Sequence, residues 1–240
     1  MPISKTDFVR GLQCEKMLWL DAHAPQLKII PPEVQARLDA GNVFGDEVMG
    51  IFGEYVETTS YKADGRLDYA KMLQTTQQLV IGGTPVICEA AFSWYGNYCA
   101  VDILKKDGNG YALYEVKNAP TVRKEFITDL GFQRLIVNKS GVKVTACYLL
   151  LSGEKPLEQD SETPQGETIV YNGKKYTVVD VTNAARTIER AASQRVFALG
   201  KLKKKDASMP CIAVGEQCEK PYRCWYFEYC HGANEKTEKE

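Results

Sequence analysis

Two acidic residues and a lysine lie on neighbouring predicted strands in the middle of the chain. The strands are predicted over 98–106 and 111–117, and the turn sequence DGNG separates them. Every two-residue turn within this sequence places Asp102 on the same sheet face as Glu115 and Lys117, because strand side chains alternate between faces. The middle register places Asp102 directly opposite Glu115.

Two facing carboxylates repel each other, and a divalent cation removes that repulsion. Oxygen ligands favour Mg²⁺ or Mn²⁺, which polarises a phosphodiester and helps to generate hydroxide from water. Lys117 would orient that water and offset charge in the transition state. Glu89, on the preceding predicted strand, would complete the acidic set directly or through water.

The alternative is an ordinary surface hairpin with a cross-strand ion pair between Glu115 and Lys117. Two features favour a site instead. The pair lies among apolar strand residues, and a predicted helix follows with Asp129 and Gln133 one turn apart.

The eight cysteines are unevenly distributed, and three of them have the spacing C-x5-C-x5-C: Cys218, Cys224 and Cys230. This spacing is wider than the C-x2-C of zinc ribbons, and four thiolates suit a [4Fe–4S] cluster. The fourth candidate ligand is Cys14 or Cys211. A ligand at Cys14 would close a loop of about 200 residues and join the two ends of the chain. The alternative is that the four cysteines of the C-terminal segment are reduced thiols packed against other residues.

Hydrophobic periodicity predicts an α/β fold in which helices flank a mixed central sheet. A first helix begins at Ser4, which forms a capping box with Asp7, and carries Cys14. A second helix begins at Pro31-Pro32 with Val34, Leu38, Val48 and Phe52 as its buried stripe, and Gly41 and Gly45 suggest close backbone packing. The other predicted helices are 66–80, 123–137 and 182–204. The other predicted strands are 85–92, with a turn at Gly96-Asn97, and 142–151, and a hairpin over 167–181 turns at Asn172-Gly173. A surface loop is predicted over 152–166, and Cys88, Cys99 and Cys147 are predicted core residues.

Composition restricts the classes of function. The chain has 240 residues and a formal net charge of −1, which excludes a generally basic surface but not a local basic groove. No apolar run approaches the ~20 residues that span a bilayer, and the N-terminus lacks a signal-peptide pattern, so a cytoplasmic protein is expected. The two histidines, His23 and His231, offer little material for histidine catalysis. The sequence contains no P-loop, so any ATP hydrolysis would come from a partner.

Five segments in order resemble the RecB-like branch of the PD-(D/E)XK nucleases, and in particular the CRISPR-associated iron–sulfur exonucleases. These are SKTDFVRGLQCEKMLWL, VDIL, YEVK, DLGFQRLIV and CEKPYRCWYFEYC. The resemblance implies a restriction-endonuclease-like fold, with Asp102 and Glu115 as metal ligands and Lys117 as the catalytic lysine. It implies that Gln133 contacts substrate or metal-bound water, and that Cys14 is the fourth cluster ligand. It also implies exonuclease action on single-stranded or ended DNA, with a helicase or CRISPR adaptation proteins as partners.

Two departures from the family pattern support a second hypothesis. The stretch GNVFGDEV has Gly45 where many relatives have a histidine, with Asp46 and Glu47 as possible substitutes, and Val137 replaces a frequent tyrosine. A catalytically weak DNA-binding subunit of a repair or CRISPR-adaptation complex is therefore the alternative. A zinc-stabilised structural protein is a third class.

The predicted organisation has four parts. Residues 1–30 form an N-terminal helix of a cluster lobe, 31–205 the nuclease core, 206–232 the cysteine-rich segment and 233–240 a disordered tail. Lys124 and Arg134 are predicted to contact nucleic acid near the acidic face, because phosphate binding requires cationic side chains.

Overall fold

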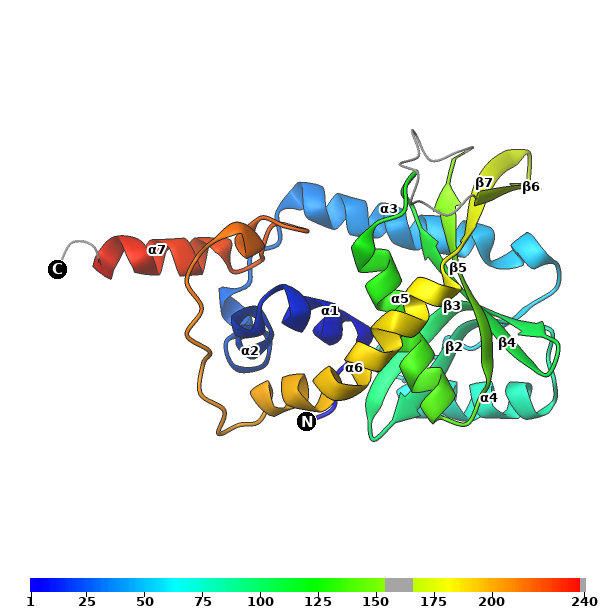
Figure 1. Cartoon of the computed structure of the whole chain (residues 1–240), viewed down its shortest axis with the longest axis horizontal. Helices are drawn as coiled ribbons and strands as arrows, with labels where there is room; N and C mark the ends of the chain where they lie inside the picture. Colours follow the sequence, from blue (N-terminus) through cyan, green and yellow to red (C-terminus); the bar gives the residue numbers. More distant parts are fainter. Residues whose placement is uncertain (154–165, 238–240) are drawn as a thin grey trace. The chain divides into compact units, whose positions relative to one another are not determined.

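The computed structural model describes residues 1–153 and 166–237, with side chains described as far as residue 232. The surface loop predicted over 152–166 therefore lies almost wholly outside the described residues. The chain divides into two compact units, one formed by Met1–Leu38 with Ser193–Glu240 and the other by Asp39–Ala192 (Figure 1). In the described part of the chain, no helix is long and apolar enough to cross a membrane.

The unit formed by residues 39–192 is built on a mixed sheet, as the sequence predicts. Its described residues form seven strands in the order β1-β2-β3-β4-β5-β7-β6. The β1/β2 and β4/β5 pairs are parallel and the other pairs are antiparallel. The strands are β1 Val56–Glu57, β2 Val86–Trp94, β3 Asn97–Asp107, β4 Gly110–Lys117, β5 Val144–Ser152, β6 Gly166–Tyr171 and β7 Lys174–Asp180.

The β3/β4 hairpin has the middle register of the three predicted. Asp107 pairs with Gly110, so the turn consists of Gly108 and Asn109. The β6/β7 turn at Asn172-Gly173 is also confirmed, and both residues have positive φ. The β2/β3 turn falls one residue earlier than predicted, because Trp94 pairs with Asn97.

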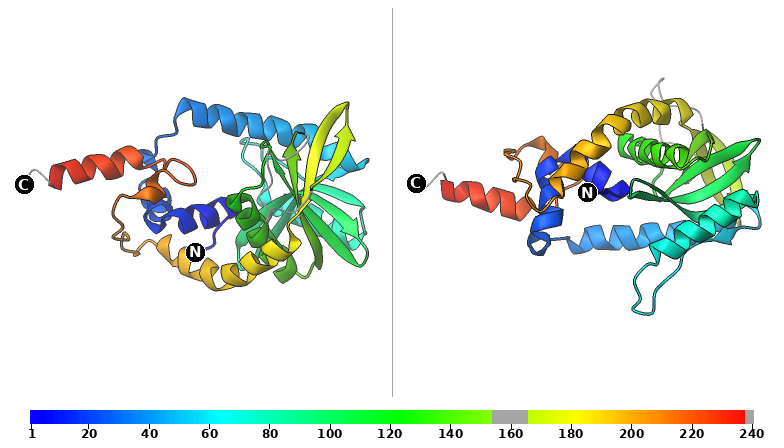
Figure 2. Two further views of the ribbon diagram at one scale, coloured as in Figure 1. Left: turned by 45° about the horizontal axis from the view of Figure 1, so that its top comes forward. Right: turned by 90° about the horizontal axis from the view of Figure 1, so that it is seen from below.

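Helices cover both faces of this sheet (Figure 2). The end of α3 (Pro32–Val48) and the following 3-10 turn cover one face, where Phe44, Val48 and Met49 pack with strand residues such as Ile103 and Tyr114. Helix α5 (Lys124–Lys139) lies on the other face, against the first half of α6 (Thr182–Leu202), and α4 (Tyr69–Ile81) packs on β2.

The predicted packing of α3 is wrong in two respects. Leu38, assigned to its buried stripe, is 42% exposed. A Cβ added at Gly41 or Gly45 would have no described atom within 4 Å, so these glycines mark no close backbone contact with the described part of the chain. Only the last turns of the helix, from Phe44, have the apolar face that a sheet can bury.

The other unit brings together the two ends of the chain. It contains α1 (Lys5–Gln13), α2 (Glu15–His23), the second half of α6, and α7 (Phe227–Thr237). The capping box of Ser4 with Asp7 is confirmed. The single first helix is not, because Cys14 adopts an extended conformation (φ −159°, ψ 115°) and separates α1 from α2. Helix α7 also extends to Thr237, although a disordered tail is predicted from residue 233; residues 238–240 lie outside the described range.

A carboxylate at the end of α2 ties the C-terminal segment of this unit to its N-terminal helices. Asp21 accepts two hydrogen bonds from Arg10, at 2.5 and 3.0 Å, and one from the Tyr226 hydroxyl at 2.8 Å. Lys28 Nζ lies 2.9 Å from Asp21 Oδ1, and the Arg10 guanidinium lies 4.0 Å from the centroid of the Trp225 ring. The network joins residues about 200 positions apart in sequence.

Candidate active site and cysteine-lined cavity

Three carboxylate residues lie at corresponding positions on neighbouring strands. The β2/β3 pairs on either side, Cys88–Ile103 and Ala90–Val101, put Glu89 level with Asp102, and one residue beyond the last β3/β4 pair, Ile103–Tyr114, Asp102 is level with Glu115. Glu89 has a positive φ of 53°, which is unusual for a residue with a side chain. Backbone strain of this kind concentrates at functional sites. The three acids predicted from the sequence are thus aligned by strand pairing.

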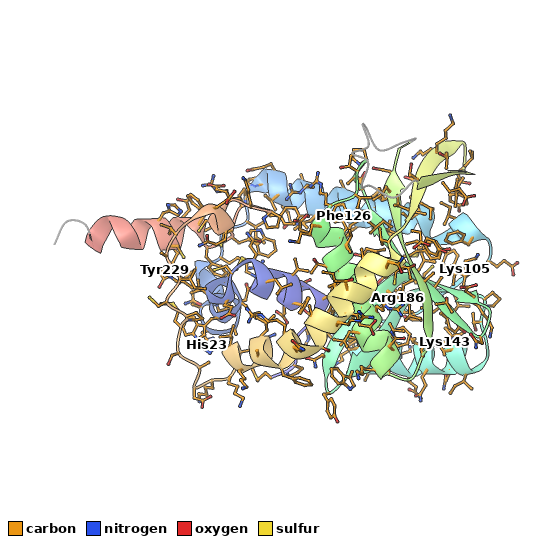
Figure 3. The ribbon with its side chains drawn as sticks, viewed as in Figure 1. His23, Lys105, Phe126, Lys143, Arg186 and Tyr229 are labelled. Atoms are coloured by element: carbon orange, nitrogen blue, oxygen red, sulfur yellow. The ribbon has the colours of Figure 1, made fainter. Side chains whose placement is uncertain are left out.

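Helix α5 completes the surroundings of Glu115 and Lys117. Lys117 Nζ lies 2.7 Å from Glu115 Oε1 and 2.7 Å from Asp129 Oδ2. Gln133 Nε2 donates a hydrogen bond to Glu115 Oε2. The Lys117 ammonium also lies 5.3 Å from the ring centroid of Phe126, which Figure 3 labels on α5. Asp129 and Gln133, one turn apart on α5, therefore contact Lys117 and Glu115, which are two residues apart on β4.

Gln133 has a buried oxygen that no protein group satisfies. Its side chain is fully buried, and Oε1 has no hydrogen-bond partner among the described residues. Reversing the amide would turn Oε1 toward the Glu115 carboxylate, where like charges repel. A buried acceptor without a partner is costly unless a donor is supplied from outside the protein. A water or a substrate hydroxyl has the required chemistry.

Asp102 is fixed by the backbone of the neighbouring strand. Its Oδ2 accepts a hydrogen bond from the Val116 N–H at 2.7 Å. Beyond the Ile103–Tyr114 pair, β4 continues alongside β5. The carboxylate thus satisfies a strand N–H at the point where the β3/β4 pairing ends, which orients it beside Glu115.

The donor set of this row fits Mg²⁺ or Mn²⁺. Among the described residues, no three His, Cys, Asp or Glu side chains are gathered as a complete set of metal ligands. Mg²⁺ does not need such a set, because it keeps several waters and binds one or two protein carboxylates together with substrate phosphates. Asp102 and Glu115 are the two carboxylates that could hold such a cation.

Asp46 and Glu47 of α3 are the acids considered as substitutes for a histidine of the resembled family, and Glu47 is bound to other residues. Glu47 Oε1 lies 2.7 Å from Lys174 Nζ and accepts a hydrogen bond from the Tyr176 hydroxyl at 2.6 Å. These bonds lower the pKa of Glu47, and burial with the Glu47 bond raises the pKa of Tyr176 to about 12. Tyr176 packs with Phe44 in the core on the α3 face, and Asp46 is exposed. Glu47 therefore serves the packing of α3.

The two predicted nucleic-acid contacts have different environments. Lys124 is exposed at the first residue of α5. Arg134 is 8% exposed, lies 2.7 Å from Glu189 Oε2, and donates to the Val144 carbonyl at 3.1 Å. A guanidinium used in this way joins α5 to α6 and β5 and is not available to a phosphate. The structure corrects the assignment of Arg134 and is compatible with that of Lys124.

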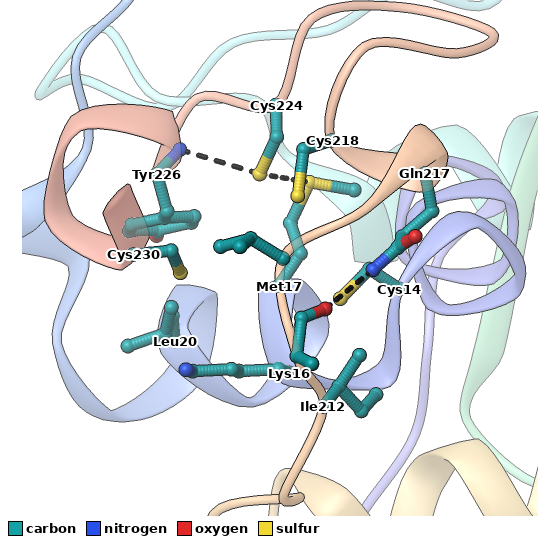
Figure 4. A pocket seen from close by; sticks show the side chains of 12 residues that line it. Cys14, Lys16, Met17, Leu20, Ile212, Gln217, Cys218, Cys224, Tyr226 and Cys230 are labelled. Atoms are coloured by element: carbon teal, nitrogen blue, oxygen red, sulfur yellow. Dashed lines mark hydrogen bonds between the residues drawn. The ribbon is translucent and has the colours of Figure 1, made fainter. Parts of the chain in front are cut away.

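Four cysteines line one cavity in the unit formed by the chain ends (Figure 4). They are Cys14, Cys218, Cys224 and Cys230, the set predicted from the sequence together with the resemblance. Cys211, the alternative fourth ligand, is exposed and does not line this cavity. The predicted core thiols Cys88, Cys99 and Cys147 are buried.

The four thiols surround a small cavity. Its volume is about 20 Å³, enough for about one water. Burial raises the pKa of the Cys224 thiol to about 11, the Tyr226 N–H at 3.4 Å opposes that rise, and the charges of the other three cysteines add to it. An iron–sulfur cluster binds its thiolates at separate iron atoms, whereas one zinc ion holds all four at about 2.3 Å. The C-x5-C-x5-C spacing of Cys218, Cys224 and Cys230 is the feature that favours the first arrangement.

The sequence did not assign Asp129 a role, and it did not place Lys16 beside the cysteines. Asp129 was visible one turn before Gln133, but only the structure shows that it binds Lys117. Lys16 lines the cysteine cavity, where burial raises the pKa of Cys230 and the charge of Lys16 opposes that rise. The spacing of Asp129 and Gln133 was an available signal, whereas the position of Lys16 depends on the break between α1 and α2.

Comparison with models of protein families gives no match to this chain, and comparison with curated proteins gives none either.

Proposed function

We propose that the protein is a metal-dependent DNA nuclease of the PD-(D/E)XK type, related to the RecB-like enzymes. The proposed substrate is single-stranded or ended DNA, digested from an end. One observation carries the proposal: Lys117 and Gln133 both contact the buried Glu115 carboxylate, and Asp102 lies level with it on the next strand. This arrangement lies on a mixed sheet covered by helices on both faces.

The side chains around Glu115 have distinct roles in the proposed reaction. A bound Mg²⁺ or Mn²⁺ would polarise the scissile phosphate and lower the pKa of a water. Asp102 and Glu115 hold the cation, with Glu89 at the end of the row. Lys117 orients the attacking water and offsets negative charge on the phosphate. The unsatisfied Oε1 of Gln133 accepts a hydrogen bond from water or substrate.

We further propose that the cysteine cavity holds a [4Fe–4S] cluster bound by Cys14, Cys218, Cys224 and Cys230. Phosphodiester hydrolysis transfers no electrons, so the cluster is assigned a structural role, joining the two ends of the chain. Unwinding of duplex DNA would require a helicase partner, because the sequence has no P-loop. CRISPR adaptation proteins are the other proposed partners. The proposed setting is the cytoplasm, where thiols remain reduced.

The test is a nuclease assay on end-labelled single-stranded DNA with anaerobically purified protein. Wild type and Glu115→Ala are compared with Mn²⁺ and with EDTA. Cleavage that requires both the metal and Glu115 is the expected result. Iron content and absorbance near 400 nm test the cluster separately, with Cys14→Ala expected to lose iron and Cys211→Ala expected to retain it.

The second candidate function is DNA binding without turnover. The observation that favours it is on α3, where Gly45 takes the place of the family histidine and Glu47 is bound to Lys174 and Tyr176. Folded, iron-containing protein that binds DNA with equal affinity as wild type and as Asp102→Ala, and that cleaves in neither form, would establish this alternative.

A further inference from the structure

We propose that Asp129 is a positioning residue that prevents Lys117 and a catalytic cation from competing for Glu115. The inference rests on the proposed function, because it concerns the same site. It assigns a role to a residue for which neither the sequence motifs nor the resemblance gives one.

The Lys117 ammonium has two carboxylate partners, Glu115 and Asp129. Lys117 Nζ lies 2.7 Å from Glu115 Oε1 and 2.7 Å from Asp129 Oδ2. Glu115 is 1% exposed and is also a proposed ligand of the cation. A buried carboxylate that must serve both an ammonium and a divalent cation brings two positive charges together, and their repulsion weakens the binding of the cation.

Asp129 relieves this competition because it gives Lys117 a second anionic partner. The side chains of Lys117 and Asp129 are 23% and 15% exposed, so water screens their interaction less than it screens a surface pair. Charge-assisted hydrogen bonds of this kind are short and stronger than neutral ones. Lys117 can therefore keep its position beside the acidic row when Glu115 binds a cation.

The fold supports this role by matching the spacing of a helix to that of a strand. Asp129 and Gln133 are four residues apart on α5, a rise of about 6 Å. Their partners Lys117 and Glu115 are two residues apart on β4, a rise of about 6.6 Å. The Gln133–Glu115 and Asp129–Lys117 contacts thus form two parallel links between helix and strand. One link holds the metal-binding carboxylate and the other holds the lysine.

The test measures Mn²⁺ affinity by calorimetry on cluster-loaded protein without DNA, so that turnover is not the readout. The variants are Asp129→Ala, Asp129→Asn, Lys117→Met and the double variant Asp129→Asn with Lys117→Met. Glu125→Gln, one turn earlier on α5, is the matched control for loss of a negative charge on the same helix. Glu115→Gln identifies binding at the proposed site.

Loss of Asp129 is expected to weaken Mn²⁺ binding about tenfold, equivalent to about 1.4 kcal/mol at 25 °C. The double variant is expected to return to within about twofold of Lys117→Met, because without the ammonium there is no competition for Glu115. Glu125→Gln is expected to bind like wild type. Asp129→Asn keeps the shape of the side chain, and so gives the result if Asp129→Ala fails to fold.

The outcomes separate this inference from the proposed function. Mn²⁺ binding that Glu115→Gln does not change would overturn both. Binding that depends on Glu115 but is unchanged in Asp129→Asn would overturn the positioning role and leave the metal site standing. A loss in Asp129→Asn that Lys117→Met does not reverse would show that Asp129 is itself a ligand, which also contradicts the proposal.

Discussion

Replacement of Asp21 by alanine is expected to destabilise the unit formed by the chain ends by about 3 kcal/mol. Asp21 is 13% exposed and receives bonds from Arg10, Lys28 and Tyr226. Removal of one member of a buried charge network costs about 3–5 kcal/mol, because the remaining charges lose their compensation. Lys28 is partly exposed and water can solvate it, so the lower end of this range applies.

The three tryptophans allow this unit to be observed separately. Trp19 and Trp225 belong to it, whereas Trp94 belongs to the sheet unit. Urea unfolding would be followed by tryptophan fluorescence in a Trp94→Phe background, with the iron removed so that the cluster does not contribute. A two-unit chain need not unfold in one transition, and restricting the signal to one unit avoids that complication.

The matched control is Glu228→Ala, in the same unit. Glu228 pairs with Arg223 at 2.9 Å, but its side chain is 62% exposed. Exposed pairs contribute about 0–1 kcal/mol, so little change is expected. If Asp21→Ala shifted the unfolding free energy no more than Glu228→Ala does, the view that this network holds the C-terminal segment in place would be refuted.

Three further predictions concern the sheet unit. Gly131→Ala should cost about 2 kcal/mol in urea unfolding, because its Cβ would lie 2.3 Å from Ile188 Cγ2; Ile188→Ala in the same chain should recover part of the loss. Arg134→Met should lower the free energy of unfolding by about 2 kcal/mol, because it removes the bonds to Glu189 and Val144. Lys124→Ala should weaken DNA binding and leave the free energy of unfolding unchanged. A destabilised Lys124→Ala, or an Arg134→Met that loses DNA binding without losing stability, would contradict these assignments. Burial raises the pKa of Cys147 from 9 to about 11, so its contribution to stability is full below pH 9 and is lost as the pH rises to about 11. The difference between the unfolding free energies at pH 8 and pH 11 should therefore be smaller in Cys147→Ala than in wild type.

The strand register near the site could be predicted because local rules determine it. The DGNG turn restricts the hairpin to a few registers, and all of them bring Asp102 to the face of Glu115 and Lys117. The alternation of side chains then determines the face without knowledge of the rest of the fold. The hairpin at Asn172-Gly173 was predictable for the same reason.

Features that depend on distant contacts were not predictable in this way. The apolar spacing around Cys14 is continuous, and nothing local indicates the extended residue that separates α1 from α2. Strand β1 has only two residues and is defined by its pairing with β2. Arginine is a residue type that commonly contacts phosphates, so the sequence favours that role for Arg134. Only the structure shows that Arg134 is buried beside Glu189.

The division of the chain has a consequence for its synthesis on the ribosome. Residues 39–192 form one unit without interruption, whereas the other unit needs residues from both ends. The sheet unit can therefore fold before residues 193–240 have all left the ribosome, since domains fold as units during synthesis. Its folding brings the two ends of a segment of about 150 residues closer together, which reduces the entropy still to be lost when Asp21 and Tyr226 meet. Until Cys218, Cys224 and Cys230 have been synthesised, Cys14 has none of its proposed partner thiols, so cluster insertion is expected to follow the folding of the sheet unit.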